Sequence, residues 1–212
     1  MLTVAILTKN EQENIAGCIA QCDFADEVLV LDQESSDDTV AIATKSGSKV
    51  ISVPSDQNFS QVRNLALQKA THPWVLYIDA DERLTLPLKI EIQKVLESKR
   101  ADYTGAFAIK RRDFFWGREM MYGELLKLRQ KGILRLVKKG SGEWTGFVHE
   151  VYRTKEPMGL LASFLDHYPH PTIASFLATI NHYSDLRAQE LFDKKTSVSW
   201  IQIILWPTGK FI

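Results

Sequence analysis

Cysteine is scarce in this chain of 212 residues, which contains only Cys18 and Cys22. The two residues lie four positions apart on an expected helix, so they share one face, and a buried pair of small side chains is the favoured interpretation. Two cysteines cannot supply a disulfide framework. This excludes the small disulfide-stapled class of proteins and fits a reducing cytoplasm.

Long apolar runs are also missing, since no stretch reaches the roughly 18 apolar residues that a complete transmembrane helix needs. Residues 1–4 lead directly into an expected strand, with no basic segment before them, so we expect no signal peptide. These two absences favour the cytoplasm, or the cytoplasmic face of the inner membrane, as the location.

Net charge is absent as well, because 26 Lys and Arg residues balance 26 Asp and Glu residues. A neutral chain has no global attraction for polyanions, so we expect no nucleic-acid partner. The charges are uneven, however: residues 1–40 hold nine acids against one base, and residues 108–140 hold ten bases against three acids. The basic stretch is either a solvated face or a surface for phosphate on a substrate or a lipid head group.

The phosphate-binding glycines of dinucleotide- and ATP-binding folds are missing too. Neither Gly-x-Gly-x-x-Gly nor a Walker loop follows the first expected strand, which argues against phosphate binding at a glycine-rich helix terminus. Acids occupy the corresponding strand ends instead. Carboxylates there can accept hydrogen bonds from a base and a ribose, or can bind a metal that neutralises a diphosphate.

What the first hundred residues do contain is a regular alternation of short apolar strands with amphipathic helices. The expected strands span residues 2–8, 27–31, 49–53 and 74–79. This alternation predicts an α/β fold with a mostly parallel central sheet that is flanked by helices and joined by right-handed crossovers. Beyond residue 100 we expect strands at 104–111 and 133–138, an irregular basic stretch at 112–131 and a helix at 170–191.

Three of the expected strands end in polar residues, namely Thr8, Asp32 and the pair Asp79 and Asp81. Because the carboxyl ends of parallel strands meet at one edge of a sheet, we expect these side chains to surround a single site. Two carboxylates there suit Mg²⁺ or Mn²⁺, with water and phosphate as the remaining ligands. The alternative is that Asp79 and Asp81 form a solvated strand end and that Asp32 caps the following helix.

Several short motifs follow one another in a specific order along the chain. The N-terminal motifs are Leu7-Thr8-Lys9-Asn10-Glu11, Val30-Leu31-Asp32 with Ser35, Asp37 and Thr39, and Asp79-Ala80-Asp81-Glu82. The later ones are Lys110-Arg111-Arg112, Gly117-Arg118, Leu134-Arg135-Leu136, Trp144-x-Gly146-x-Val148-His149-Glu150 and Asp166-His167-Tyr168. Together these motifs, which cover roughly residues 2–192, resemble family 2 glycosyltransferases and, within them, the branch of lipopolysaccharide-core glucosyltransferases. This resemblance implies the GT-A fold of nucleotide-diphosphosugar transferases, here with a C-terminal helical extension.

The resemblance implies a role for each matching position. The residues expected to bind the nucleotide-sugar donor are Thr8, Asn10, Glu11, Asp32, Arg63 and Asp79. Those expected at the metal ion are Asp81, Asp79 and His149, with Asp81 as the more direct ligand. The chain departs from the family pattern at Gln33-Glu34, where a small Ser-Gly pair is commoner, so the loop after Asp32 is bulkier.

On the acceptor side, the resemblance implies that Glu150 is the general base, with Glu143 as its rival. The residues expected to contact the acceptor or phosphate are Arg111, Arg112, Arg118 and Trp144. Each has an ordinary structural alternative: Glu150 as a surface partner of Arg153, His149 as a core histidine, and Trp144 as a core residue. His167 and His170 are expected to be structural.

These observations predict an inverting glycosyltransferase that moves a hexose from a nucleotide-diphosphate sugar, most simply a UDP-sugar, to a hydroxyl of a cell-envelope glycan or lipid-linked saccharide. A Mg²⁺ or Mn²⁺ cofactor would stabilise the leaving diphosphate, and a single base with no evident nucleophile favours inversion. The rivals are a sugar-phosphate nucleotidyltransferase and a non-catalytic module that binds a nucleotide or a glycan.

We expect one glycosyltransferase domain over residues 1–192, with a donor half at 1–100 and an acceptor half at 101–192. The apolar segment 193–212 is either a last core helix or an interfacial segment that contacts the membrane peripherally, since Trp200, Trp206 and Lys210 suit a membrane boundary. We also expect fuller relatives to continue beyond residue 212.

Overall fold

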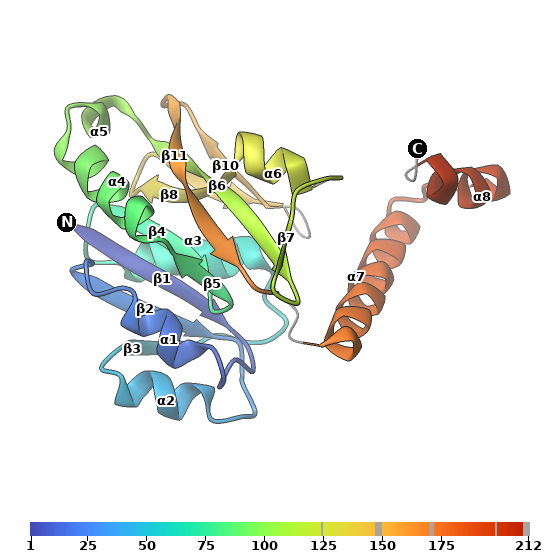
Figure 1. Ribbon diagram of the computed structural model, residues 1–212, viewed down its shortest axis with the longest axis horizontal. Helices are drawn as coiled ribbons and strands as arrows, with labels where there is room; N and C mark the ends of the chain where they lie inside the picture. Colours follow the sequence, from blue (N-terminus) through green and yellow to red (C-terminus); the bar gives the residue numbers. More distant parts are fainter. Residues whose placement is uncertain (124, 147–149, 170–171, 198, 210–212) are drawn as a thin grey trace. The chain divides into compact units, whose positions relative to one another are not determined.

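The computed structural model describes residues 1–123, 125–146, 150–169, 172–197 and 199–209. The chain divides into two compact units, Met1–Pro171 and Thr172–Ile212. Figure 1 shows the elements of both units in sequence colours.

The first unit contains a large sheet in the order β3-β2-β1-β4-β8-β6-β11-β5, with β7 paired to β6. Its first four strands are parallel neighbours: β1 (Leu2–Thr8), β2 (Glu27–Asp32), β3 (Lys49–Ser52) and β4 (Trp74–Asp79). The remaining strands are β5 (Glu82–Leu84), β6 (Ala106–Phe115), β7 (Arg118–Met120), β8 (Ile133–Lys138) and β11 (Met158–His167). Since β8 runs antiparallel between β4 and β6, and β11 is parallel to β6, most of the sheet shares one direction.

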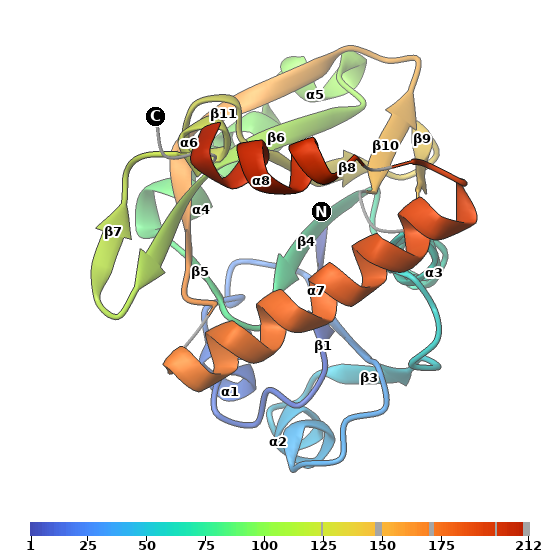
Figure 2. The same cartoon turned by 90° about the vertical axis from the view of Figure 1, so that its right-hand side faces the viewer.

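Helices cover both faces of this sheet. They are α1 (Ile15–Ala20), α2 (Thr39–Lys45), α3 (Phe59–Lys69), α4 (Leu86–Glu97), α5 (Arg100–Tyr103) and α6 (Leu125–Lys131). A separate two-stranded sheet pairs β9 (Gly142–Thr145) with β10 (Val151–Thr154). Figure 2 shows α4 on one side of the large sheet and α3 with β9 and β10 on the other.

Two buried apolar clusters follow from the alternation of side chains along the strands. Along β1, Val4 and Ile6 belong to one cluster together with residues of α1 and α4, whereas Ala5 and Leu7 belong to the other, with residues of α3, β9 and β10. A strand buried on both faces reads as a continuous apolar run, which is why β1 was recognisable in the sequence. The sheet is therefore a rigid platform between two cores.

Local sequence signals explain where the main helices begin. Asn58 and Gln61 form a reciprocal capping box at the start of α3. Thr85 caps α4, and Pro87 occupies its first turn, where a missing amide N–H costs nothing. Both helices therefore start at the positions that the sequence indicates.

The predicted α/β fold with a mostly parallel sheet and flanking helices is confirmed, but the prediction after residue 100 was incomplete. The stretch 112–131, expected to be irregular, contains the end of β6, all of β7 and helix α6. Strand β11 was not expected. Its register against β6 shifts between Leu161 and Phe164, and such a bulge breaks the two-residue periodicity that identifies a strand.

The second unit contains α7 (Ile173–Asp193) and α8 (Trp200–Gly209). A capping box between Thr172 and Ser175 begins α7. Helix α8 exposes large apolar side chains, among them Trp200 at 71% and Ile203 at 65%. Within the described part of the chain, neither of these helices nor any other is long and apolar enough to cross a membrane. The extent of 1–192 for the transferase domain stays a prediction.

Candidate active site

Three of the predicted donor-site residues meet at the carboxyl ends of neighbouring strands. Thr8 lies opposite Asp32, and Leu7 lies opposite Asp79, so the ends of β1, β2 and β4 are in register. Thr8 and Asp32 are buried. The hydroxyl oxygen of Thr8 has no hydrogen-bond partner among the described residues. A buried polar group without a partner marks a place where a ligand can supply one.

The loops after β1 and β2 are tied together by Asn10 and Asp32. Asn10 has a left-handed φ of 56°; its N–H donates to Ser35 Oγ at 2.8 Å, and its Oδ1 accepts from the N–H of Ser36 at 2.8 Å. The Asp32 carboxylate accepts from both the N–H and the hydroxyl of Ser35, at 3.0 and 2.5 Å. Asp32 thus holds this loop and does not cap α2, which begins at Thr39.

Glu11 belongs to the same pair of loops. Its N–H donates to Thr39 Oγ1 at 2.8 Å, and its carboxylate accepts from Asn14 Nδ2 at 2.7 Å. Burial raises the pKa of Glu11, and the negative charge of Asp81 raises it further, against the lowering effect of the Asn14 hydrogen bond. The two carboxylates are therefore close enough for the charge of Asp81 to act on Glu11.

A buried guanidinium joins two acids of the Asp79–Glu82 motif. Arg135, on β8, lies 2.6 Å from Asp79 Oδ2 and 2.7 Å from Glu82 Oε1. Burial raises the pKa of Glu82 despite this partner. For Asp79, burial alone would also raise the pKa, but the charges of Arg135 and Arg63 outweigh it and lower that pKa. Asp79 is therefore ionised and committed to Arg135.

The other acid of the motif, Asp81, meets a histidine. His167 Nε2, at the end of β11, lies 3.4 Å from Asp81 Oδ2, and His167 Nδ1 lies 2.6 Å from Asp113 Oδ1. Asp113 also pairs with Arg111 at 2.8 Å. Burial lowers the pKa of His167, but hydrogen bonds to Asp113 and Asp81 outweigh burial and raise it to about 9.

This cluster carries an excess of negative charge. Its four carboxylates belong to Asp79, Asp81, Glu82 and Asp113, and its two guanidiniums to Arg111 and Arg135. With its raised pKa the His167 imidazole is cationic at neutral pH, so the acids exceed the cationic groups by one charge, and by two once that proton is lost. A divalent cation would balance that excess.

The residues present fit such a cation at one point of the cluster. No group of three His, Cys, Asp or Glu side chains that could hold a metal occurs in the described part of the chain. Asp81 and His167 are nevertheless as close as neighbouring ligands of an octahedral Mg²⁺ or Mn²⁺, which are roughly 3 Å apart, and such ions often take their other ligands from water and phosphate. Asp79 faces Arg135, and the predicted ligand His149 lies outside the described residues.

The predicted base, Glu150, pairs with Arg63 and not with Arg153. Glu150 Oε1 lies 3.1 Å from Arg63 Nη2, and the Glu150 side chain is 19% exposed. Arg153 instead donates to Thr145 Oγ1 at 3.1 Å. The rival base, Glu143, is exposed on β9. Glu150 is therefore the acid that lies beside Arg63, a buried residue that is predicted to bind the donor.

Helix α3 fixes the segment before Glu150. Asn64 Nδ2 donates to the carbonyl of Trp144 at 2.8 Å, and the N–H of Trp144 donates to Asn64 Oδ1 at 2.9 Å. Ser60 Oγ donates to the carbonyl of Gly146 at 2.6 Å. Side chains of α3 thus hold strand β9 and the following Gly146 in place by hydrogen bonds.

The four residues expected on the acceptor side lie in different environments. Trp144 is 4% exposed and packs edge-on against Tyr77, with 5.5 Å between the ring centres. The guanidinium carbon of Arg63 lies 4.8 Å from the ring centre of Trp144. In this conformation its ring is a core group with no face open for stacking on an acceptor. Arg118 is exposed on β7.

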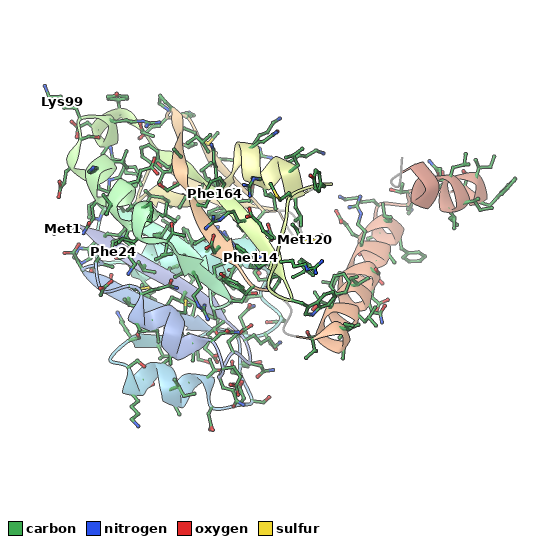
Figure 3. The ribbon with its side chains drawn as sticks, viewed as in Figure 1. Met1, Phe24, Lys99, Phe114, Met120 and Phe164 are labelled. Carbon is green, nitrogen blue, oxygen red and sulfur yellow. The ribbon has the colours of Figure 1, made fainter. Side chains whose placement is uncertain are left out.

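Arg111 and Arg112 already have carboxylate partners. Arg111 pairs with Asp113 inside the acidic cluster. Arg112 makes two hydrogen bonds to Asp166, at 2.7 and 2.9 Å. Its guanidinium carbon also lies 5.7 Å from the ring centre of Phe114 and 5.2 Å from that of Phe164, two residues labelled in Figure 3. Neither arginine is free to bind phosphate in this arrangement.

The structure adds to this cluster Glu82, Asp113 and Arg135, to which the sequence reasoning gave no individual role, and His167, which was expected to be structural. A signal for His167 was available, because Asp166-His167 ends a strand just as Asp79 does, but β11 itself had not been recognised. The burial of Arg135 could not be predicted, because a charged residue within Leu134-Arg135-Leu136 resembles the solvent-facing position of an alternating strand.

Comparison with known proteins identifies the family. Residues 3–149 match the model of the family described as "Glycosyl transferase family 2". This chain belongs to that family. An uncharacterized glycosyltransferase of Rickettsia conorii is 41% identical over 110 residues, which cover 51% of this chain and 39% of that protein. The lipopolysaccharide core biosynthesis glycosyltransferase LpsC of Rhizobium meliloti is 24% identical over 219 residues, 100% of this chain and 79% of that protein.

Among solved structures, glucosyl-3-phosphoglycerate synthase from Mycobacterium tuberculosis, in complex with Mn²⁺, UDP and phosphoglyceric acid, aligns with a TM-score of 0.57. The identity is 17%, and the alignment covers 81% of this chain and 72% of that one. The predicted GT-A type of α/β fold is thereby confirmed. The chain aligns with only about two fifths of the length of two Rickettsia glycosyltransferases, 39% of one and 38% of the other.

Arg135, which pairs with both Asp79 and Glu82, yields a stability prediction. In Arg135→Met the carboxylate of Glu82 loses its closest cation while it stays buried, so the free energy of unfolding should fall by about 3–5 kcal/mol. Urea denaturation at neutral pH measures this loss. Arg118→Met, which removes an exposed arginine from β7, is the control and should change stability by less than about 0.5 kcal/mol. Equal effects of the two substitutions would contradict the assigned role of Arg135.

Proposed function

We propose that this chain is an inverting glycosyltransferase that moves a hexose from a UDP-sugar to a hydroxyl of a cell-envelope glycan or a lipid-linked saccharide. The observation that carries the proposal is the meeting of Thr8, Asp32 and the Asp81–His167 pair at one edge of the sheet. The full-length similarity to LpsC supports a lipopolysaccharide-type acceptor. The Mn²⁺ and UDP bound to the structurally similar synthase agree with the donor and the metal.

Asp81 and His167 would hold the divalent cation, Mg²⁺ or Mn²⁺. When bound, this ion supplies a Lewis acid that stabilises the charge on the leaving diphosphate. His167 thus takes the ligand position for which the sequence offered His149. Asp79 would act indirectly, because its pairing with Arg135 fixes the turn that carries Asp81.

The donor nucleotide would lie over the ends of β1 and β2. The buried carboxylate of Asp32 accepts hydrogen bonds at both oxygens from Ser35, yet each carboxylate oxygen has a further lone pair for a ribose hydroxyl or a base N–H. Beside it, Thr8 offers a hydroxyl that has no hydrogen-bond partner in the described part of the chain. The loop held by Asn10 and Glu11 would form the adjoining wall.

Glu150 is the proposed general base. Its carboxylate would take the proton of the acceptor hydroxyl as that oxygen forms the new bond to the sugar. The ion pair with Arg63 determines where the carboxylate lies. One base and one displacement give inversion at the anomeric carbon.

The two rival functions are less well supported. A sugar-phosphate nucleotidyltransferase would want a glycine-rich basic loop after β1, whereas that loop is here Lys9-Asn10-Glu11 and is held by Ser35 and Ser36. A non-catalytic module would have no need for a base. Glu150 is present and lies beside Arg63.

We also propose that α8 contacts an anionic membrane surface, where a lipid-linked acceptor would lie. Residues 194–212 contain three lysines, two tryptophans and no acid. Helix α8 exposes Trp200, Ile201 and Ile203. Exposed apolar side chains with tryptophan on a helix, and lysines in the segments that flank it, are typical of a segment that lies in the interface.

Asp81→Ala tests the donor site. Wild-type protein should bind UDP in calorimetry only when Mn²⁺ or Mg²⁺ is present, and Asp81→Ala should weaken that binding by about tenfold or more because a direct ligand is lost. Asp102→Ala, an exposed acid on α5, is the control and should bind like the wild type. UDP binding by the wild type that ignores the metal, or no UDP binding at all, would contradict the proposal.

Glu150→Gln tests the base. It should lower the rate of UDP release from a UDP-hexose in the presence of lipopolysaccharide core acceptors by roughly 10²–10⁴-fold, while metal-dependent UDP binding stays intact. Glu143→Gln is the matched control and should retain activity. An unchanged rate in Glu150→Gln would exclude Glu150 as the base, and loss in Glu143→Gln alone would transfer the role to that residue. No acceptor-dependent UDP release by the wild type would argue for the binding module.

Sedimentation with vesicles tests the membrane contact. The protein should co-sediment with phosphatidylglycerol vesicles, and binding should fall with added salt because lysines contribute to it. The double variant Ile203→Ser with Leu205→Ser should lose this binding. Tyr122→Ser, which removes another exposed side chain (83%), should not. No vesicle binding by the wild type, or self-association through α8 in its place, would contradict the proposal.

A further inference from the structure

Asp113 contacts the histidine of the proposed metal pair from the side opposite Asp81. Asp113 lies on β6 and His167 lies directly opposite on the parallel neighbour β11. The Asp113 side chain is buried, at 2% exposure, and its Oδ1 is 2.6 Å from His167 Nδ1. Two adjacent strands of the rigid sheet therefore hold this contact.

The partners of Asp113 decide which ring nitrogen carries a proton. Arg111 Nη2 lies 2.8 Å from Asp113 Oδ1, and Arg111 Nε donates to Oδ2 at 3.3 Å. A carboxylate that pairs with a guanidinium at these distances is ionised and only accepts hydrogen bonds, so His167 Nδ1 must be the donor.

Because Nδ1 carries the proton, the other ring nitrogen, Nε2, has its lone pair on the side of Asp81. A neutral imidazole that is protonated at Nδ1 has its one available lone pair at Nε2, and Nε2 is the atom 3.4 Å from Asp81 Oδ2. Histidine ligands of metal ions commonly donate their second N–H to a carboxylate, which fixes the tautomer and the ring orientation. We propose that Asp113 is a positioning residue that holds His167 with Nε2 directed at the cation beside Asp81, an inference that rests on the proposed function.

The ordinary alternative is that Asp113 only neutralises Arg111. The same two strands provide a control for that role, because Arg112 and Asp166 form an ion pair one register step away, with bonds of 2.7 and 2.9 Å. Asp166→Asn removes a carboxylate from an arginine on this ladder without touching the imidazole of His167. If Asp113 only neutralises Arg111, then Asp113→Asn and Asp166→Asn should have similar effects on Mn²⁺ binding.

Mn²⁺ titration followed by electron paramagnetic resonance, with and without UDP, separates the two roles. Asp113→Asn should weaken Mn²⁺ binding by about 10–100-fold, the usual effect of losing the carboxylate partner of a ligating histidine, whereas Asp166→Asn should leave it unchanged. Equal binding by Asp113→Asn and wild type, or equal weakening in both variants, would overturn the inference. Thermal unfolding identifies a variant that fails to fold, and Asp113→Glu, which keeps the carboxylate, should then retain more affinity than Asp113→Asn.

Nitrogen-15 NMR of the imidazole provides a readout that needs no metal. At a pH high enough for the His167 imidazole to be neutral, the wild-type ring should be protonated at Nδ1. Asp113→Asn should shift the population toward the Nε2–H form, and His167→Gln assigns the signal among the five histidines. An Nε2–H ring in the wild type would overturn the inference. If the wild type shows the Nδ1–H form but binds no Mn²⁺, the proposed function fails while the positioning by Asp113 stands.

Discussion

The concentration of negative charge at the carboxyl edge of the sheet is the constraint on which the rest of the site depends. Asp79, Asp81, Glu82 and Asp113 would repel one another if each stood alone in a largely buried cluster. Arg135 links two of them and Arg111 pairs with a third. Among the described residues, the Asp81 carboxylate faces a histidine and no arginine, and this makes it the acid most open to a metal ion.

The topology of the second half of the sheet brings these compensating groups to the acids. Strand β8 is inserted antiparallel beside β4, with Leu136 opposite Leu76, so Arg135 lies nearer the strand end that carries Asp79. Strands β6 and β11 then deliver Asp113 and His167 in direct register. The parallel half presents Asp79, with Asp81 in the turn that follows, and the mixed half presents Glu82, Asp113, the two arginines and the histidine. The site exists because both halves share one continuous sheet.

The sequence alone predicted the parallel half well, because its strands are buried on both faces and its acids follow them directly. It predicted Thr8, Asp32 and Asp79 at one edge, as observed. It failed where a local pattern was ambiguous. The bulge in β11 concealed the strand that carries His167, and Trp144 could not be placed because its burial depends on contacts with Asn64 and Tyr77, distant in the chain.

The most direct test of the account is a crystal structure of the protein with Mn²⁺ and UDP, with diffraction recorded at the manganese absorption edge. The account predicts one anomalous peak between the Asp81 carboxylate and His167 Nε2, with the diphosphate on its open side and the uridine over the ends of β1 and β2. A manganese ion held by Asp79 or by other side chains, with His167 still bound only to carboxylates, would contradict it.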